Sequence, residues 1–432
     1  MINALGLLKR RRFLPLFVTQ FLGAFNDNLF KTSMVLFATY AIFNDAGAEA
    51  NFNALATGLA ILPFFLLSAL AGQLADSHDK ARIIRLVKTA EIGIMVVGSA
   101  GLLAAKLGHI HLGLGLMLGA VLLLGTHSTF FGPIKYAILP QHLRPDDVLG
   151  GTGLVEAGTY LAILIGTVTA GFLAKLPEWW TVGAVIGVAV VGWFAGRQVP
   201  PAPREGPPLK LNYNPFTSSW RLIAATMHIP RLFLAILAIS FFWTIATVLI
   251  IIFPPLVKNV QTADEQVASV AIAVFSVGVA IGSVVINTML KGCISARYSP
   301  LSVIAMGGFV ALFSVLARNW TGAPAGSFYG FTDFIAQPGA IPILLTLLAI
   351  AVTGGMFVVP LYAFLTTTVE KDQTARTVAA NNVVNAGAMT IGSIAVLGIT
   401  GFGVGPEDML FLVSAMCLVS AWIAQKLHRA CD

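Results

Sequence analysis

Four polar residues lie inside one long apolar stretch near the start of the chain. The stretch from Phe13 to Phe43 is long enough to cross a bilayer as one tilted helix, and Asn26, Asp27, Asn28 and Lys31 lie near its middle. A charged side chain at the centre of a bilayer costs about 2.5–3.5 kcal/mol on insertion scales, so such a residue has to face protein or water. Asp27 and Lys31 are four residues apart with the acid first, which favours an ion pair on one helix face.

Two interpretations of this polar group remain open. In the first, Asp27 and Lys31 only neutralise each other. In the second, Asn26 and Asn28 widen the polar face beyond what one ion pair needs, and the group forms one wall of a polar cavity. We favour the second interpretation, in which other helices enclose this stretch and the polar residues bind a substrate.

The composition places the chain in a membrane. Of its 432 residues, 57% are hydrophobic and 10% charged, and the mean hydropathy is +0.85. Because a soluble surface needs about 25–35% charged residues, we predict an all-α integral membrane protein. The net charge of +7 does not indicate nucleic-acid binding, since the basic residues lie in short loops. Three cysteines show no metal or disulfide spacing, and we expect no cofactor, no metal and no catalytic residue.

Twelve apolar segments are long enough to be membrane spans. They are 13–43, 54–76, 81–106, 111–140, 147–175, 178–198, 229–258, 265–290, 298–318, 339–369, 374–403 and 407–427. The one linker-like segment runs from Pro200 to Ile229, and five prolines lie between Pro200 and Pro208 at its start. We therefore predict an N-terminal six-helix half (1–199), a cytoplasmic Pro-rich linker (200–228) and a C-terminal six-helix half (229–432).

The basic residues predict the orientation. With these spans, 21 of the 26 Lys and Arg residues lie on the side of the N-terminus, four lie on the other side, and Lys31 lies within a span. Basic loops face the cytoplasm, so we expect both termini there.

An internal repeat indicates how the spans are grouped. The segment Gly153–Gly158 in span 5 parallels Asn382–Gly387 in span 11, and Pro133–Leu139 in span 4 parallels Pro360–Leu365 in span 10. Two matched pairs in the same order predict two halves of equal topology. This is similar to the parallel repeat of the major facilitator fold, in which the site lies between the halves near the midplane.

The loop between spans 2 and 3 carries a charged motif. It contains Gly72, Asp76, Lys80 and Arg82, and it resembles the signature G-x-L-A-D-x-x-x-[RK]-x-[RK] of major facilitator transporters. We expect Gly72 to allow close helix packing and the three charged residues to form a gate on the cytoplasmic side. A plain solvated run of charges is the alternative.

Two further acids lie within predicted spans. Glu91 and Glu156 each lie about three turns into their span. A carboxylate there is either protonated and structural or a proton-coupling group. For Glu91 both interpretations stay open. For Glu156 we favour a functional role because it lies in the repeated motif, where its counterpart Asn385 cannot titrate.

Further candidate residues lie near the ends and middles of other spans. Lys135 and Tyr136 follow Pro133, and Lys135 either extends to the cytoplasmic interface or meets the phosphate of a substrate. Asn381, Asn382 and Asn385 form a polar face that is either glue between helices or a cavity wall, and we favour the wall.

Residues of span 4 allow two more expectations. His127 and Ser128 lie near its middle and either line a cavity or are simply hydrogen-bonded. Gly113, Gly115 and Gly119 are expected to be close-packing residues.

Four stretches carry a narrower resemblance. Residues 20–31, 132–139, 153–164 and 375–386 look like the bacterial lysophospholipid transporter family and, more closely, the transporter portion of proteins that fuse it to acyltransferase and acyl-ligase domains. The resemblance implies a flippase that moves lysophospholipids, such as lysophosphatidylethanolamine and lysophosphatidylglycerol, from the outer to the inner leaflet of the bacterial inner membrane. A cytoplasmic enzyme then reacylates them.

The same resemblance places two residues of this chain at motif positions of the family, and the chain differs from the family in one respect. Asp27 and Lys135 match motif positions of the family. A basic residue is expected in span 7 to pair with the acid of span 1, but Phe241–Ile252 has none. We therefore predict a non-enzymatic transporter working by alternating access, and the partners we expect are membrane lipids and a separate cytoplasmic acyltransferase or acyl-ligase. The alternatives are a proton-coupled exporter of amphipathic drugs and a membrane-embedded acyl-transfer enzyme.

Overall fold

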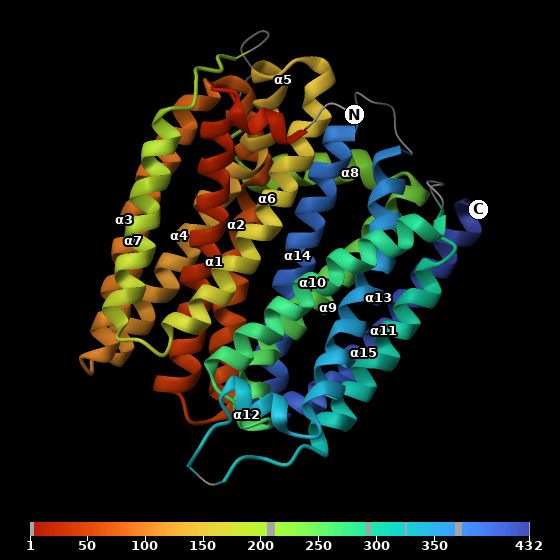
Figure 1. Ribbon diagram of the computed structural model, residues 1–432. Coiled ribbons are helices and arrows are strands. Elements are labelled where there is room, and N and C mark those ends of the chain that lie inside the picture. Colours follow the sequence, from red (N-terminus) through yellow and green to blue (C-terminus); the bar gives the residue numbers. More distant parts are fainter. Residues whose placement is uncertain (1–3, 205–211, 291–294, 325, 368–373, 432) are drawn as a thin grey trace. The chain divides into compact units, whose positions relative to one another are not determined.

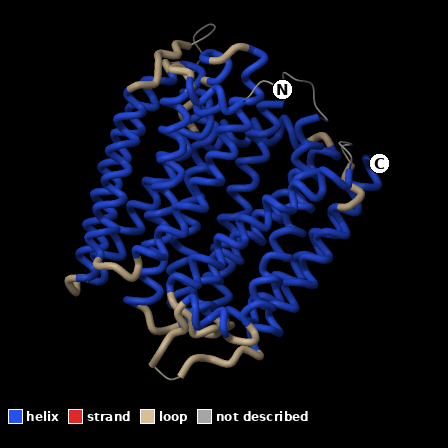
Figure 2. The backbone as a smooth tube through the Cα atoms, in the orientation of Figure 1, coloured by secondary structure: helices blue, strands red, loops and turns tan. Residues whose placement is uncertain are grey.

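The chain is built almost entirely of helices joined by short connections (Figures 1 and 2). The computed structural model describes residues 4–204, 212–290, 295–324, 326–367 and 374–431. The side chains of some residues within the described helices, Asp76 and Glu156 among them, lie outside that description. In these ranges the sole β-type pairing is an isolated bridge between Ala263 and Tyr329.

In the described residues, twelve long helices overlap the twelve predicted spans. They are α1 (Leu14–Phe37), α2 (Ala46–Ser77), α3 (Lys80–Lys106), α4 (Ile110–Ala137), α6 (Pro145–Leu173), α7 (Glu178–Arg197), α9 (Pro230–Asn259), α10 (Glu265–Leu290), α11 (Ser299–Arg318), α13 (Ala340–Thr367), α14 (Thr374–Gly401) and α15 (Pro406–Cys431). Within the described residues, ten of these are long and apolar enough to cross a membrane, and α6 contributes a shorter apolar helix, Ala157–Leu173. The predicted all-α fold with twelve helices is confirmed.

Local chemistry accounts for where several helices begin. Proline is the first residue of α6, α9 and α15, where its missing N–H is not needed and its backbone angle suits a helix. Helix α2 begins well before its predicted start at 54, because the Asp45 side chain accepts a hydrogen bond from the Ala48 N–H at 2.7 Å. Its first turns are polar and include Glu49, so hydropathy alone does not detect them.

Five short elements were not predicted. They are the 3₁₀-helix η1 (Ala4–Lys9), the π-helix η2 (Ala38–Ile42), α5 (Leu139–His142), α8 (Pro215–Met227) and α12 (Phe331–Ala336). Helix α8 lies in the segment that the sequence marks as a linker. The Asn214 side chain caps it by accepting from the N–H groups of Phe216 and Thr217, at 3.0 and 3.2 Å.

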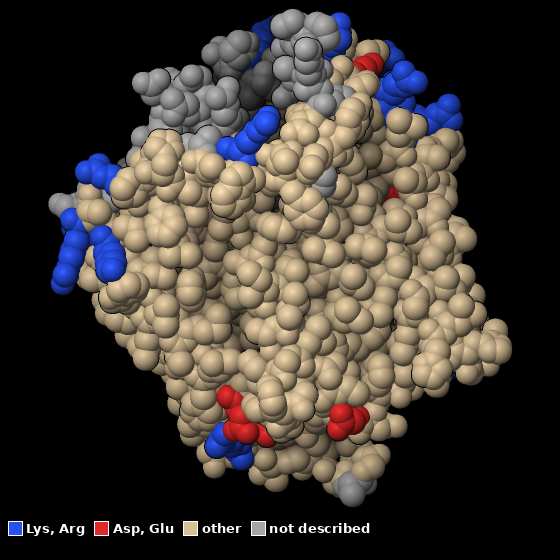
Figure 3. All heavy atoms as spheres, turned by 180° about the vertical axis from the view of Figure 1, so that it is seen from behind, with Lys and Arg blue, Asp and Glu red and all other residues tan. Residues whose placement is uncertain are grey.

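The chain divides into two compact units. Unit 1 comprises residues 1–34 and 66–218, and unit 2 comprises residues 35–65 and 219–432. The end of α1 and the beginning of α2 thus belong to unit 2. The predicted halves 1–199 and 229–432 stay predictions. On the face shown in Figure 3 most of the visible surface carries neither basic nor acidic side chains, as expected of helices that face lipid.

Glycines bring helices of unit 1 together. A Cβ atom at Gly113 would lie 2.5 Å from the Ala105 Cβ and 2.7 Å from the Gly101 carbonyl oxygen, so α3 and α4 touch through their backbones. The expected close packing is confirmed at Gly113. It is wrong for Gly115 and Gly119, where a Cβ would meet no described atom within 4 Å.

The repeated motif has a structural counterpart in both units. In unit 1, a Cβ at Gly158 of α6 would lie 2.7 Å from the ring of Phe17 on α1. In unit 2, a Cβ at Gly387 of α14 would lie 3.1 Å from the ring of Phe65 on α2. The equivalent glycine of each repeat thus makes room for a phenylalanine of another helix in its own unit.

Candidate functional site

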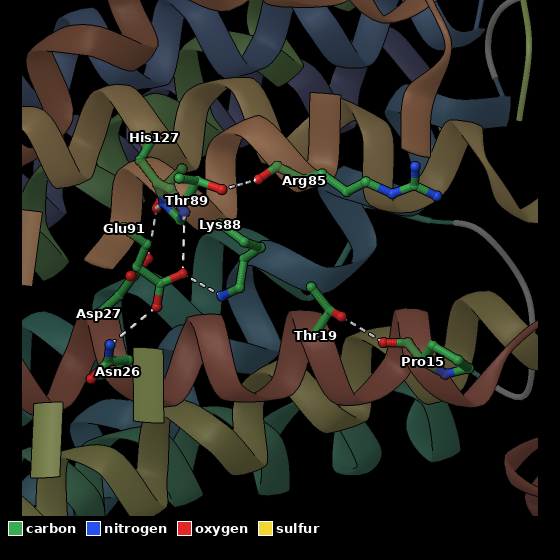
Figure 4. A network of polar contacts seen from close by, with 10 residues as sticks. Pro15, Thr19, Asn26, Asp27, Arg85, Lys88, Thr89, Glu91 and His127 are labelled. Atoms are coloured by element: carbon green, nitrogen blue, oxygen red, sulfur yellow. Dashed lines mark hydrogen bonds and ion pairs between the residues drawn. The ribbon is translucent and has the colours of Figure 1, made fainter. Parts of the chain in front are cut away.

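A buried carboxylate connects three helices of unit 1 (Figure 4). Glu91 of α3 is fully buried, and the Asn26 Nδ2 of α1 donates to its Oε1 at 3.1 Å. Lys88, one turn earlier on α3, donates to the Oε2 of the same carboxylate, and His127 Nε2 of α4 lies 3.3 Å from that oxygen. Because the acid is contacted from three helices, it holds them in register, and its charge is balanced by a buried ammonium.

Glycines make room for the Lys88 side chain. A Cβ at Gly23 of α1 would lie 3.2 Å from Lys88 Nζ, and one at Gly192 of α7 would lie 3.1 Å from its Cε and Nζ. A Cβ at Gly196 would lie 3.2 Å from Lys88 Cγ. Lys88 was counted among the basic residues outside the spans, and this is wrong, since it is 1% exposed and lies within α3.

Asp27 is paired differently from the prediction. Ser128 of α4 donates to Asp27 Oδ2 at 2.6 Å, whereas the described residues show no ion pair between Asp27 and Lys31. The second carboxylate oxygen, Asp27 Oδ1, is buried and has no described hydrogen-bond partner. Asn28 does not join this group, because its Nδ2 donates to the Ala24 carbonyl of its own helix at 2.8 Å.

Lys135 lies in a second polar group of unit 1. Its Nζ donates to Thr159 Oγ1 of α6 at 3.4 Å and lies 4.9 Å from the centre of the Tyr136 ring. The Thr159 hydroxyl donates to the Oε1 of the buried Gln20 of α1 at 2.8 Å. The group therefore joins α1, α4 and α6. The Glu156 side chain, predicted for this region, lies outside the described residues.

A polar group of unit 2 contains Asn385. Its Oδ1 accepts from Ser240 of α9 at 2.7 Å, and its Nδ2 lies 3.4 Å from the Tyr362 hydroxyl of α13. Trp243 Nε1 donates to the same hydroxyl at 2.7 Å. Tyr362 lies in the repeated segment Pro360–Leu365, whereas a lone hydroxyl such as Ser240 in an apolar span gives no periodic signal.

The three asparagines of α14 do not share one face. Asn381 is fully buried and Asn385 nearly so, whereas Asn382 is exposed. Residues four apart share a helix face, so Asn381 and Asn385 both face the interior of unit 2. Successive residues point about 100° apart, so Asn382 points away from that face. The prediction of one polar wall is corrected to a buried pair with a separate exposed residue.

Asp79, at an unspecified position of the motif, fixes the charged loop before α3 by its hydrogen bonds. Asp79 Oδ1 accepts from the N–H groups of Ala81 and Ala202, at 2.9 and 3.0 Å, so it caps α3 and also holds the segment after α7. The Lys80 N–H donates to the Ala202 carbonyl at 3.0 Å.

The predicted gate residues differ in their surroundings. Lys80 is buried and Arg82 is exposed, and the Asp76 side chain lies outside the described residues. A Cβ at Gly72 would meet no described atom within 4 Å, so the close packing expected there is wrong.

A second buried ion pair lies in unit 2. Lys258, near the end of α9, donates from Nζ to Glu49 Oε1 at 2.5 Å and to the Thr39 and Phe43 carbonyl oxygens at 2.5 and 2.6 Å. Asn259 Nδ2 donates to Glu49 Oε2 at 2.5 Å. Lys258 is the last residue of the predicted span 229–258, and Glu49 lies outside every predicted span. Only the fold brings them together.

These groups contain charges and hydroxyls but no metal cluster. Among the described residues, no three His, Cys, Asp or Glu side chains are grouped to hold a metal ion. What the site offers is hydrogen bonds and opposite charges inside apolar helices, which suits binding of a polar or amphipathic molecule.

Known proteins resemble this chain over most of its length. It is 27% identical to the lysophospholipid transporter LplT of Cronobacter sakazakii over 389 residues, covering 88% of this chain and 85% of that one. It is 26% identical to LplT of Salmonella typhimurium over 370 residues, covering 82% and 78%.

Solved structures of transporters share the fold. A bacterial homologue of the iron transporter ferroportin in an inward-facing state superposes with a TM-score of 0.70 at 13% identity, covering 97% of this chain and 98% of that chain. A peptide transporter, POT, gives 0.70 at 12% identity, covering 100% and 99%. The family model of the Major Facilitator Superfamily matches residues 16–393, most of the chain, and the chain therefore belongs to the Major Facilitator Superfamily.

Proposed function

We propose that this chain transports lysophospholipids, moving them from the outer to the inner leaflet of the bacterial inner membrane by alternating access. The observation that carries the proposal is the likeness to lysophospholipid transporters over 88% of this chain and 85% of the relative. Buried polar groups inside otherwise apolar helices support it, because a lysophospholipid has one charged head group and one acyl chain.

The head group would meet polar residues of the predicted spans. The proposed contacts are Asn26, Asp27, Asn28, Lys31, Lys135, Tyr136, Glu156, Asn381, Asn382 and Asn385. Lys135 is the proposed phosphate contact: its ammonium donates to Thr159 Oγ1 and lies beside the Tyr136 ring, and both contacts orient the cation. Asn28 and Lys31 have no described contact with the Glu91 group and would contribute through the substrate alone.

Gating, orientation and partners belong to the same proposal. Gly72, Asp76, Lys80 and Arg82 would close the cytoplasmic side, with Asp79 holding the start of α3 against the Ala202 backbone. Both termini would be cytoplasmic. A separate cytoplasmic acyltransferase or acyl-ligase would reacylate the delivered lipid.

Transport by purified protein tests the function. Vesicles containing the protein receive fluorescent lysophosphatidylethanolamine or lysophosphatidylglycerol in the outer leaflet, and albumin then extracts what has not crossed. We expect albumin-protected lysolipid to accumulate, and the two-chain parent lipid to cross at least tenfold more slowly. Transport of a cationic amphipathic drug with no movement of lysolipid would instead identify an exporter.

A matched pair of lysines tests the head-group contact. Lys135→Met should abolish uptake, because the phosphate loses its counter-charge. Lys106→Met should retain uptake, because Lys106 lies at the end of α3, is mostly exposed and pairs with Glu178 at 2.7 Å. Equal uptake by both variants would remove Lys135 from the site.

A further inference from the structure

Helix α8 carries an apolar face that the described part of the chain leaves exposed. Phe216 is 66% exposed and Trp220 is 72% exposed. Ala224, four residues after Trp220, is exposed as well. Residues four apart lie on the same side of a helix, so Phe216, Trp220 and Ala224 form one strip, which we call the aromatic face.

The opposite side of α8 packs on the protein. Ser218 is buried and lies two residues from each ring, which places it about 200° around the helix from Phe216. Gln73 of α2 donates from Nε2 to Ser218 Oγ at 3.3 Å, and Gln73 Oε1 accepts from the Asn212 N–H at 2.8 Å. These contacts fix the beginning of α8 on α2, so the side that carries the rings points away from α2.

The charges beside the aromatic face are positive. Arg221 directly follows Trp220 and is exposed, and Arg231, in the first turn of α9, is exposed too. Residues 212–231 of the sequence contain no Asp and no Glu. A helix with aromatic rings on one side and basic residues next to them suits the interface of an anionic membrane, where rings enter the headgroup region and basic side chains meet phosphates.

The chain places α8 next to a membrane span. Only His228 and Ile229 separate the end of α8 from α9, which is long and apolar enough to cross a bilayer. Phe233, in the first turn of α9, is 40% exposed, as a side chain that faces lipid would be. Residues 219–227 of α8 belong to unit 2 and lie at the same end of that unit as the C-terminus (Figure 1). The aromatic face therefore continues the lipid-facing surface of α9 at the edge of the bilayer.

We propose that the aromatic face of α8 docks on the membrane surface, and that its partner is the anionic phospholipid of the leaflet on the side of the C-terminus. The helix lies along that surface, with Phe216 and Trp220 in the headgroup region and Arg221 at the lipid phosphates. The basic residues of the sequence predict that this leaflet is the cytoplasmic one. The inference does not depend on what the protein transports, because it follows from the faces and charges of α8 and its place beside α9.

A spin label on an intact aromatic face tests this placement. In a background with Cys293, Cys417 and Cys431 replaced, a nitroxide is attached at Ala224→Cys, which keeps both rings. The protein is placed in vesicles of equal parts phosphatidylcholine and phosphatidylglycerol. Oxygen, which concentrates in lipid, should relax this label several-fold more than a water-soluble nickel chelate does.

The control label is at Phe402→Cys, in the exposed turn after α14, where the chelate should be the stronger relaxant. Chelate access at Ala224→Cys equal to that at Phe402→Cys would show that α8 faces water, and it would overturn the proposal. Dipolar broadening between labels at Ala224→Cys would show that a second copy of the chain covers the face, and this would overturn the proposal as well.

Variants separate the contribution of the rings from that of the charge. In the Ala224→Cys protein, Phe216→Ser with Trp220→Ser should lower the ratio of oxygen to chelate access several-fold, whereas Phe402→Ser should leave it unchanged. In vesicles of phosphatidylcholine alone the ratio should fall, and Arg221→Gln should make that fall smaller. A ratio that is unaffected by the loss of both rings and by the loss of anionic lipid would contradict docking of this face.

Discussion

Lys258 and Glu49 form a buried ion pair whose 2.5 Å contact fastens the end of the first span and the beginning of the second to α9 within unit 2. Glu49 is fully buried and Lys258 is 7% exposed. The ammonium also satisfies two backbone carbonyls, Thr39 and Phe43, at the π-helical end of the first span. One side chain thus donates to a carboxylate and to two backbone acceptors.

Removing one partner of this pair should be more costly than removing both. Lys258→Met leaves a buried carboxylate uncompensated, which costs about 3–5 kcal/mol. Glu49→Gln with Lys258→Met should recover part of that loss, but not all, because two carbonyls still lack their donor. Thermal unfolding in detergent checks the order. A double variant less stable than Lys258→Met would contradict the pairing.

The hydrogen bond from Ser128 to Asp27 predicts how variants of Asp27 and Lys31 should behave. Asp27 is bonded to Ser128 of α4 rather than to Lys31. Removing both charges of α1 should therefore not restore the activity that is lost when Asp27 alone is replaced. Asp27→Asn should fold and be inactive, Lys31→Met should be impaired, and the double variant should fold and stay inactive. Lysolipid uptake per unit of folded protein is the measurement. Near-normal uptake by the double variant would show that the two residues serve only to neutralise each other.

Alanine substitutions at Gly113 and Gly115 of α4 should have different effects on the stability of the protein. Gly113→Ala places a Cβ against the backbone of α3, and overpacking of this kind costs about 1–3 kcal/mol. Gly115→Ala meets open space, so it should be neutral or stabilise the helix by up to about 1 kcal/mol. The midpoint of thermal unfolding compares the two. Equal destabilisation by both would contradict the close approach at Gly113.

His142 should make stability depend on pH. Burial lowers the pKa of this histidine of α5 below its ordinary value of 6.5, although a contact with the Pro201 carbonyl opposes the shift. The unfolded chain then binds the proton more readily than the folded one. Stability is full above the unfolded pKa of about 6.5 and falls as pH drops through the lower folded value.

The variant His142→Gln should weaken that dependence. Unfolding temperatures of the wild type and His142→Gln are compared between about pH 5 and pH 8, where histidine titrates. His78→Gln, at an exposed histidine, is the control and should keep the wild-type slope. A steeper loss of stability at low pH in His142→Gln would reverse the expected sign.

Orientation can be tested at two exposed positions. Phe402, after α14, is 89% exposed, and Tyr213, before α8, is 69% exposed. In a background with Cys293, Cys417 and Cys431 replaced, an impermeant thiol reagent added to intact cells should label Phe402→Cys. It should label Tyr213→Cys only after permeabilisation. Labelling of Tyr213→Cys in intact cells would overturn the predicted topology.

The sequence by itself determined the class of protein and the course of its spans. Apolar length is sufficient for this, because in lipid a helix must satisfy its own backbone, and the bilayer sets how long it has to be. The predicted boundaries therefore agree with helices such as α10 and α11 to within a residue. Repetition along the chain also indicated equivalent glycines, which the structure finds at Gly158 and Gly387.

Only the tertiary structure decided the partners of Asp27 and Lys258. Asp27 is four residues from Lys31 but bonds Ser128, which is 101 residues away, and Lys258 bonds Glu49 across 209 residues. Spacing along a chain reports which residues can share a helix face, and it carries no information about which other helix packs on that face. Asp27 and Lys258 take their partners from such neighbouring elements, so these contacts appear only once the helices are packed.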